Sequence, residues 1–162
     1  MPVPFAPLTD ASLQGLIAHL RQPWEVGILL VRRGGFAVAH LTGTETRDSK
    51  VGKRHVQGRS KAGGWSQQRF ARRRDNQAKA AFDAAAEHAD RLLSPIVSRL
   101  DLVATGGDRK AVEAVLARRE LAPLSERPQH WLGGVADPRR DVLLRAIVQV
   151  RSLDVAITDP AA

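Results

Sequence analysis

The spacing of apolar residues divides the chain into helical and extended segments. Residues 10–21 place four aliphatic side chains on one helical face, with Thr9 or Asp10 available as the N-terminal cap. The run VGILLVRRGGFAVAHLTG at 26–43 predicts a β-hairpin, and the nearly continuous apolar character of its first half predicts a central strand. Residues 44–60 carry mainly polar and basic side chains, which is typical of an edge strand that leads into a loop.

The second half of the chain continues this alternation of helices and strands. A long helix is expected from about Gln67 to Leu93, because apolar residues recur there every three or four positions. The remaining elements are expected as a strand at 101–105, a helix at 109–119 capped by Asp108, a helix opened by Asp137-Pro138, and a strand at about 152–157, with room for one optional strand between the last two helices. The order predicts an α/β fold, a mixed β-sheet packed with helices, in a single domain over 1–162.

Composition narrows the possible functions mostly by exclusion. There is no cysteine, and the five histidines have no short-spaced pair, so we expect neither a disulfide nor a metal site. No glycine-rich nucleotide motif follows a strand, and no cofactor is expected. Apolar runs are too short to span a membrane, so the sequence predicts a soluble, cytoplasmic protein.

Positive charge is concentrated in one segment, residues 47–74. The segment holds ten Lys and Arg residues against one acid, Asp48, whereas the whole chain has a net charge of +8. Within it, residues 58–66 contain three glycines and are expected to form a mobile loop. This concentration favours a surface that binds a polyanion, and the alternative is a solvated charged loop.

The residue types in this segment suit RNA. Arginines can hold phosphates, Trp65 can stack on a base, and Gly63 and Gly64 allow close approach of the backbone. Phe70 can either stack in the same way or anchor the following helix on the sheet.

The stretch GGWSQQRFARRR resembles the GGQ region of eukaryotic and archaeal peptide-chain release factors. Eight positions match that pattern without gaps: Gly63, Gly64, Ser66, Arg69, Phe70, Ala71, Arg72 and Arg74. The glutamine of GGQ aligns with Trp65 here, and the Ser66-Gln67 pair is closer to the Vms-like release factors, which carry a Gly-Ser-Gln arrangement. The resemblance implies the RNase H-like mixed sheet of the release-factor middle domain.

The resemblance also implies a site and an activity. Gln67 is the first candidate for orienting water at a peptidyl-tRNA ester, and Gln68 is the second, within a loop shaped by Gly63, Gly64, Trp65 and Ser66. The expected RNA-binding residues are Lys50, Lys53, Arg54, Arg59, Lys61, Arg69, Arg72 and Arg73. The expected partners of this monomer are the large ribosomal subunit RNA and peptidyl-tRNA.

Two other functions remain open at this point. The chain could be a non-catalytic module that binds ribosomal or transfer RNA, or an endonuclease that cuts tRNA near its acceptor end.

Overall fold

The computed structural model describes residues 7–53 and 65–152, and within helix α2 it describes side chains only at Asn76 and from Ala78 onward. Its strands are β1 (Glu25–Arg32), β2 (Gly35–Thr42), β3 (Glu45–Lys53), β4 (Leu102–Gly107) and β5 (Gln129–Leu132). Its helices are α1 (Leu13–Arg21), α2 (Trp65–Leu93), α3 (Arg109–Leu116), α4 (Ala122–Ser125) and α5 (Arg140–Val150), with short 3-10 helices η1 (Ser94–Arg99) and η2 (Arg119–Leu121).

The described strands form one mixed sheet in the order β3-β2-β1-β4-β5. β2 runs antiparallel to both β1 and β3, whereas β4 runs parallel to β1 and to β5. The carboxyl ends of β1, β3, β4 and β5 therefore meet at the same edge of the sheet. The predicted α/β fold with a mixed sheet is confirmed, and so is the central position of β1.

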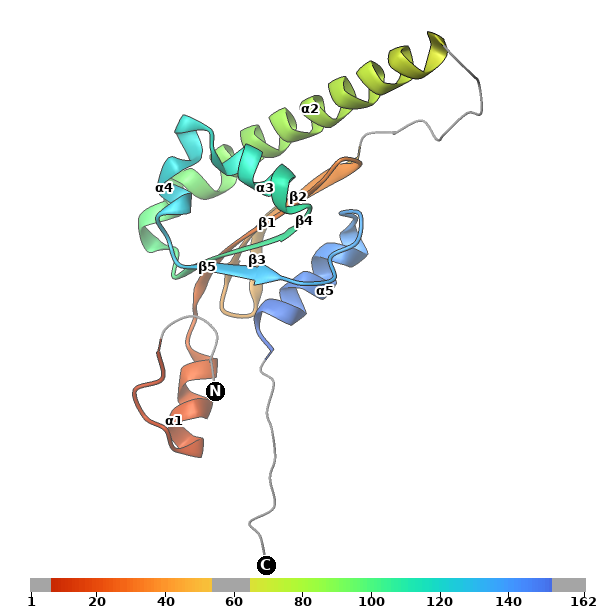
Figure 1. Ribbon diagram of the computed structural model, residues 1–162. Coiled ribbons are helices and arrows are strands. Elements are labelled where there is room, and N and C mark those ends of the chain that lie inside the picture. The colour runs from red at the N-terminus through yellow and green to blue at the C-terminus, as the bar shows by residue number, and fades with distance from the viewer. Residues whose placement is uncertain (1–6, 54–64, 153–162) are drawn as a thin grey trace, which may run out of the picture.

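Both faces of the sheet are covered, and the alternation of side chains along β1 shows how (Figure 1). Leu29 and Val31 point to the face covered by α2 and α3. Ile28 and Leu30 point to the opposite face, where α5 packs. A strand buried on both sides must be apolar at every position, which explains the uninterrupted run in this part of the sequence.

The C-terminal half of α2 lies close to the sheet because its buried face consists mainly of alanine. Ala81, Ala85, Ala86 and Ala89 are almost fully buried against the core. Their small side chains bring the helix backbone near the sheet. Among the strands, α2 contacts β2 most extensively and β3 and β1 less.

Several predicted boundaries differ from the structure. The cap of α1 is Ser12, whose hydroxyl accepts a hydrogen bond from Gly15 N, whereas Asp10 accepts one from Ser12 N. The predicted cap Asp137 is not the cap of the last helix, which begins at Arg140 after Arg139; the Asp137 carboxylate pairs with Arg32 at 3.5 Å.

The edge strand β5 has only a weak signal in the sequence. β5 lies at Gln129–Leu132, in a polar stretch whose pattern is too short to predict a strand by itself. The strand predicted at 152–157 lies almost wholly outside the described residues.

Candidate nucleic-acid interface

The glutamine candidates lie at the start of the longest helix. α2 begins at Trp65, so Trp65, Ser66, Gln67 and Gln68 belong to its first turn, and the predicted loop ends two residues earlier than expected. With 29 residues, α2 is about 43 Å long. The loop glycines Gly63 and Gly64 and the predicted RNA-binding residues Arg54, Arg59 and Lys61 lie outside the described residues. Arg69, Arg72 and Arg73 belong to α2 by their backbone.

This helix is anchored to the sheet through its C-terminal half. The N-terminal half extends past the edge of the sheet where β3 ends (Figure 1). Asp83 pairs with Arg118 near η2, and the ring of His88 stacks on Phe36 of β2 with centroids 5.4 Å apart. The arrangement therefore presents the first turn of α2 away from the core while its other end is held by packing.

The contact between α2 and the sheet includes one titratable group, His88. Burial lowers the pKa of its imidazole, and the nearby charges of Arg91 and Lys50 lower it further. The charge of Glu87 acts in the opposite direction and does not reverse the shift. The Nδ1 atom is buried without a hydrogen-bond partner among the described residues. The folded protein therefore favours the neutral ring at this position.

Two of the predicted RNA-binding residues lie on the edge strand β3. Lys50 and Lys53 are both exposed there. Among the described strands β3 pairs only with β2, and its side chains from Glu45 to Lys50 are exposed. Polar and charged side chains are suited to an edge strand because they disfavour pairing with a second chain. The same arrangement places positive charge beside the segment that joins β3 to α2.

The fold adds cations to this edge that no local pattern singled out. Three connections reach the edge where the carboxyl ends of the strands meet. They are the β1–β2 turn, the segment from β4 to the start of α3, and the segment from β5 to the start of α5. With the end of β3, they define what we call the carboxyl-end rim: Arg33, Lys53, Arg109, Lys110, Arg139 and Arg140, all exposed. Open α/β sheets commonly bind ligands outside the carboxyl ends of their strands.

The acids near the rim already have partners. Asp108 caps α3 by accepting a hydrogen bond from Ala111 N, at 3.2 Å. Asp137 pairs with Arg32 at 3.5 Å, and Asp141 pairs with Arg145 at 3.0 Å.

The rim cations themselves are not neutralised in this way. None of them forms an ion pair with a carboxylate in the described part of the chain. Arg109 instead lies over the ring of Trp131, 4.4 Å from its centroid. The rim is therefore a positively charged surface whose acids are occupied elsewhere.

Sequence reasoning missed five of the six rim residues because they are distant from one another in the chain. Arg33, Arg109 and Arg140 each sit among ordinary turn or helix-start residues. For Arg33, Arg109 and Lys110 the available signal was their position shortly after predicted strands, and it becomes informative only when the strands are known to run parallel.

Two kinds of feature are missing from the described residues. No group of three or more His, Asp or Glu side chains is placed there to share a metal ion. No helix within 7–53 and 65–152 has the length and apolar character needed to cross a membrane.

The comparison with known protein families agrees with the sequence resemblance. Residues 24–156 match the family model described as Actinobacteria/chloroflexi VLRF1 release factor. The chain is similar to the crystal structure of the archaeal translation termination factor aRF1, with 17% sequence identity and a TM-score of 0.45 over 78% of this chain. It spans 36% of the length of that archaeal factor. A search of curated proteins found no match.

Proposed function

Because the chain belongs to the VLRF1 release factor family, we propose that it hydrolyses the ester of peptidyl-tRNA on the large ribosomal subunit. The observation that carries this proposal is the position of Gln67. It lies in the first turn of a helix whose N-terminal half projects beyond the edge of the sheet that carries the exposed cations of the rim. The setting is ribosome rescue or quality control in the cytoplasm.

The chemistry requires little more than orientation of a water molecule. A glutamine amide is neutral, so it can donate and accept hydrogen bonds to water but cannot deprotonate it. Water attacks the ester carbonyl carbon, a new C–O bond forms, and the bond to the ribose oxygen of the tRNA breaks. One water proton ends on that ribose oxygen, so the products are a peptide acid and a tRNA with a free terminal hydroxyl.

An extended helix suits the task because the ester lies in a confined RNA-lined centre. Gln67 acts first in this proposal and Gln68 second, while Gly63 and Gly64 allow the backbone to approach closely. Placing water correctly next to the reacting carbonyl contributes by proximity and orientation rather than by acid–base catalysis.

Binding is assigned to the cations around that helix. Lys50 and Lys53 of β3, with the rim, are proposed to contact phosphates of ribosomal or transfer RNA. The same role is proposed for the residues predicted from sequence in the connecting segment and the start of α2: Arg54, Arg59, Lys61, Arg69, Arg72 and Arg73. Phosphate contacts of this kind position the protein without reading sequence.

The decisive experiment measures release of labelled peptide from peptidyl-tRNA bound to large subunits. Gln67→Ala is expected to lower the release rate by about a hundredfold, the order expected for losing one positioned polar group, with subunit binding unchanged. Gln77→Ala is the matched control, since it makes the same substitution in α2 about 15 Å further along the helix.

The outcomes separate this proposal from its rivals. Normal release in both Gln67→Ala and Gln68→Ala would refute the catalytic role and leave an RNA-binding module. A shortened tRNA among the products, detected by mapping its 3′ end, would instead indicate an endonuclease.

A further inference from the structure

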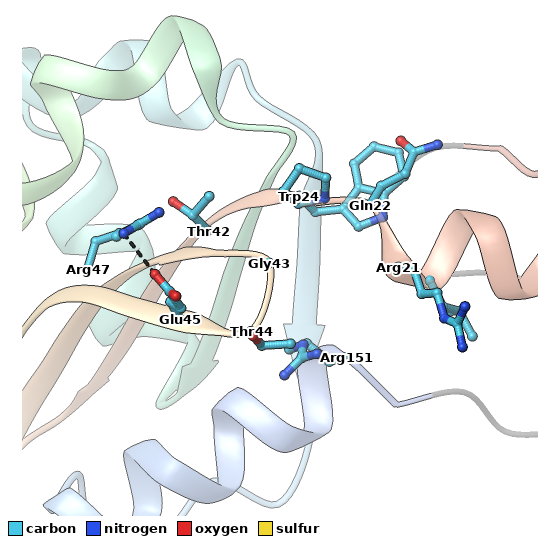
Figure 2. Close-up of a pocket in the computed structure, with 11 residues that line it drawn as sticks. Arg21, Gln22, Trp24, Thr42, Gly43, Thr44, Glu45, Arg47 and Arg151 are labelled. Carbon is cyan, nitrogen blue, oxygen red and sulfur yellow. Dashed lines mark ion pairs between the residues drawn. The ribbon is translucent and has the colours of Figure 1, made fainter.

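A second positively charged site lies at the opposite end of the sheet. A cleft of about 420 Å³ opens between the end of α1, the start of β1, the β2–β3 turn and the end of α5 (Figure 2). This volume falls in the range of small-molecule and cofactor sites. The cleft and the carboxyl-end rim lie at opposite ends of β1, a strand of eight residues about 25 Å long, so a single phosphate cannot contact both.

Three arginines from three separate parts of the chain line this cleft. Arg21 ends α1, Arg47 lies on β3, and Arg151 directly follows α5. Figure 2 shows Arg151 close to the β2–β3 turn at Thr44, with Arg47 and Arg21 on opposite sides of the cleft.

The one acid in the lining does not neutralise this charge. Glu45 pairs with Arg47 at 2.8 Å, and the two side chains are 66% and 53% exposed, so solvent weakens their attraction. Neither Arg21 nor Arg151 forms an ion pair with any carboxylate of residues 7–53 and 65–152. Guanidinium groups match the geometry of phosphate oxygens, and no carboxylate in the described part of the chain competes for these two.

An aromatic wall stands beside the arginines. The indole nitrogen of Trp24 donates a hydrogen bond to the carbonyl of His19 at 2.8 Å, and its ring contacts the His19 ring at 4.9 Å. These contacts fix the indole at the cleft, where Gln22 and Thr44 add an amide and a hydroxyl. Arginines combined with an ordered aromatic ring are typical of sites for single-stranded nucleic acid.

We propose that this cleft binds one phosphate and its adjoining nucleotide in a single-stranded RNA segment. Arg21 and Arg151 hold the phosphate oxygens, and the adjoining nucleotide lies in the cleft lined by Gln22, Trp24 and Thr44. The choice of RNA over other phosphate-bearing molecules rests on the proposed ribosomal function.

The cleft is also built partly from residues outside the family match. The match begins at residue 24, whereas Arg21, Gln22 and Pro23 of the lining precede it. We therefore assign to this chain a second RNA contact, distinct from the site at the start of α2 and completed by α1.

The test follows the indole N–H resonances of the full chain by NMR while RNA is added. Trp24 reports on the cleft and Trp131, which lies under Arg109, reports on the carboxyl-end rim. The probes are a short single-stranded RNA, inorganic phosphate and oligoglutamate. Each tryptophan resonance is assigned by its Trp→Phe variant.

A saturable shift of the Trp24 resonance with RNA is expected, together with competition by phosphate. Arg21→Gln and Arg151→Gln should each weaken this binding by about tenfold, which is the loss of one charge-assisted contact. Arg119→Gln is the matched control, because Arg119 is exposed on η2 and does not line the cleft, and it should change the affinity by less than about twofold. An unchanged Trp24 resonance position before RNA addition verifies that each variant keeps the cleft.

Three results would overturn the proposal. The first is a Trp24 resonance that RNA does not shift. The second is an Arg119→Gln variant that binds RNA as weakly as Arg21→Gln and Arg151→Gln. The third is a Trp24 shift caused by oligoglutamate but not by RNA, which would assign the cleft to an acidic protein. Because no ester or ribosome is present, failure here leaves the Gln67 release experiment intact, and failure of that experiment leaves this one intact.

Discussion

Removing cations from the carboxyl-end rim tests whether this edge of the sheet binds ribosomal or transfer RNA. Arg33 lies in the β1–β2 turn and Arg140 opens α5, and both are exposed. Neither is paired with a carboxylate of the described residues. Replacing either by alanine therefore removes charge without breaking an internal contact that holds the fold together.

The expected loss can be worked out from this exposure. One solvent-exposed contact between a cation and a phosphate contributes about 1 kcal/mol, which is about fivefold in affinity. Arg33 and Arg140 belong to separate elements, so their effects should add, and the double variant should bind about 25-fold more weakly. Each lost contact should also flatten the plot of log affinity against log salt by about 0.7–0.9.

The assay is cosedimentation with purified large ribosomal subunits over a series of potassium chloride concentrations. Arg119→Ala is the control, since it removes an exposed arginine from η2, which contacts the anchored part of α2. An Arg33→Ala, Arg140→Ala double variant that binds as tightly as the control, with the same salt slope, would refute the assignment of the rim to RNA.

Two further predictions concern the parts of the fold that hold the site. The pKa of His88 is lowered in the folded protein, so the stability that the neutral imidazole contributes is complete above the unfolded pKa of about 6.5 and is lost as pH falls below that value. The melting temperature of the His88→Phe variant should lack this dependence on pH. Gly107 has φ +106, and a Cβ there would lie 2.3 Å from the carbonyl oxygen of Val31, so Gly107→Ala should lower the free energy of unfolding by about 3 kcal/mol or more in denaturant titrations. Gly133→Ala, where a Cβ meets nothing within 4 Å, should leave stability nearly unchanged, and an equal loss in both variants would contradict the steric explanation.

Much of the sheet was predictable because its pattern is local. The apolar run of β1 and the basic, polar character of β3 identify a central and an edge strand without knowledge of the rest of the chain. The long helix was equally clear, since its buried alanines repeat at helical spacing. The four-residue strand β5 could not be predicted in this way, because it is defined by pairing with β4 rather than by its own side chains.

The carboxyl-end rim and the cleft, like β5, are defined by tertiary structure rather than by a local sequence pattern. Arg151 lies more than a hundred residues after Arg21 and Arg47 in the sequence, and only the fold brings the three around one cleft. The glutamine candidates differ, because they lie in one continuous motif that is recognisable from the amino-acid sequence alone. Local sequence thus predicted where chemistry is proposed to occur, whereas most of the surfaces proposed to hold RNA required the tertiary arrangement.

The geometry of α2 explains why catalysis by Gln67 would depend on those surfaces. The helix is anchored by buried residues from Ala81 onward, while Gln67 lies in its first turn. The part of the helix between Ala81 and Gln67 is about 21 Å long, so a tilt of about 5° at Ala81 displaces Gln67 by about 2 Å. That displacement exceeds the tolerance for placing water beside an ester carbonyl, where an error of about 1 Å can cost about a hundredfold in rate. Packing against the sheet is therefore insufficient to position the glutamine, and contacts between RNA and the cations around β3 and the rim would have to complete that positioning on the ribosome.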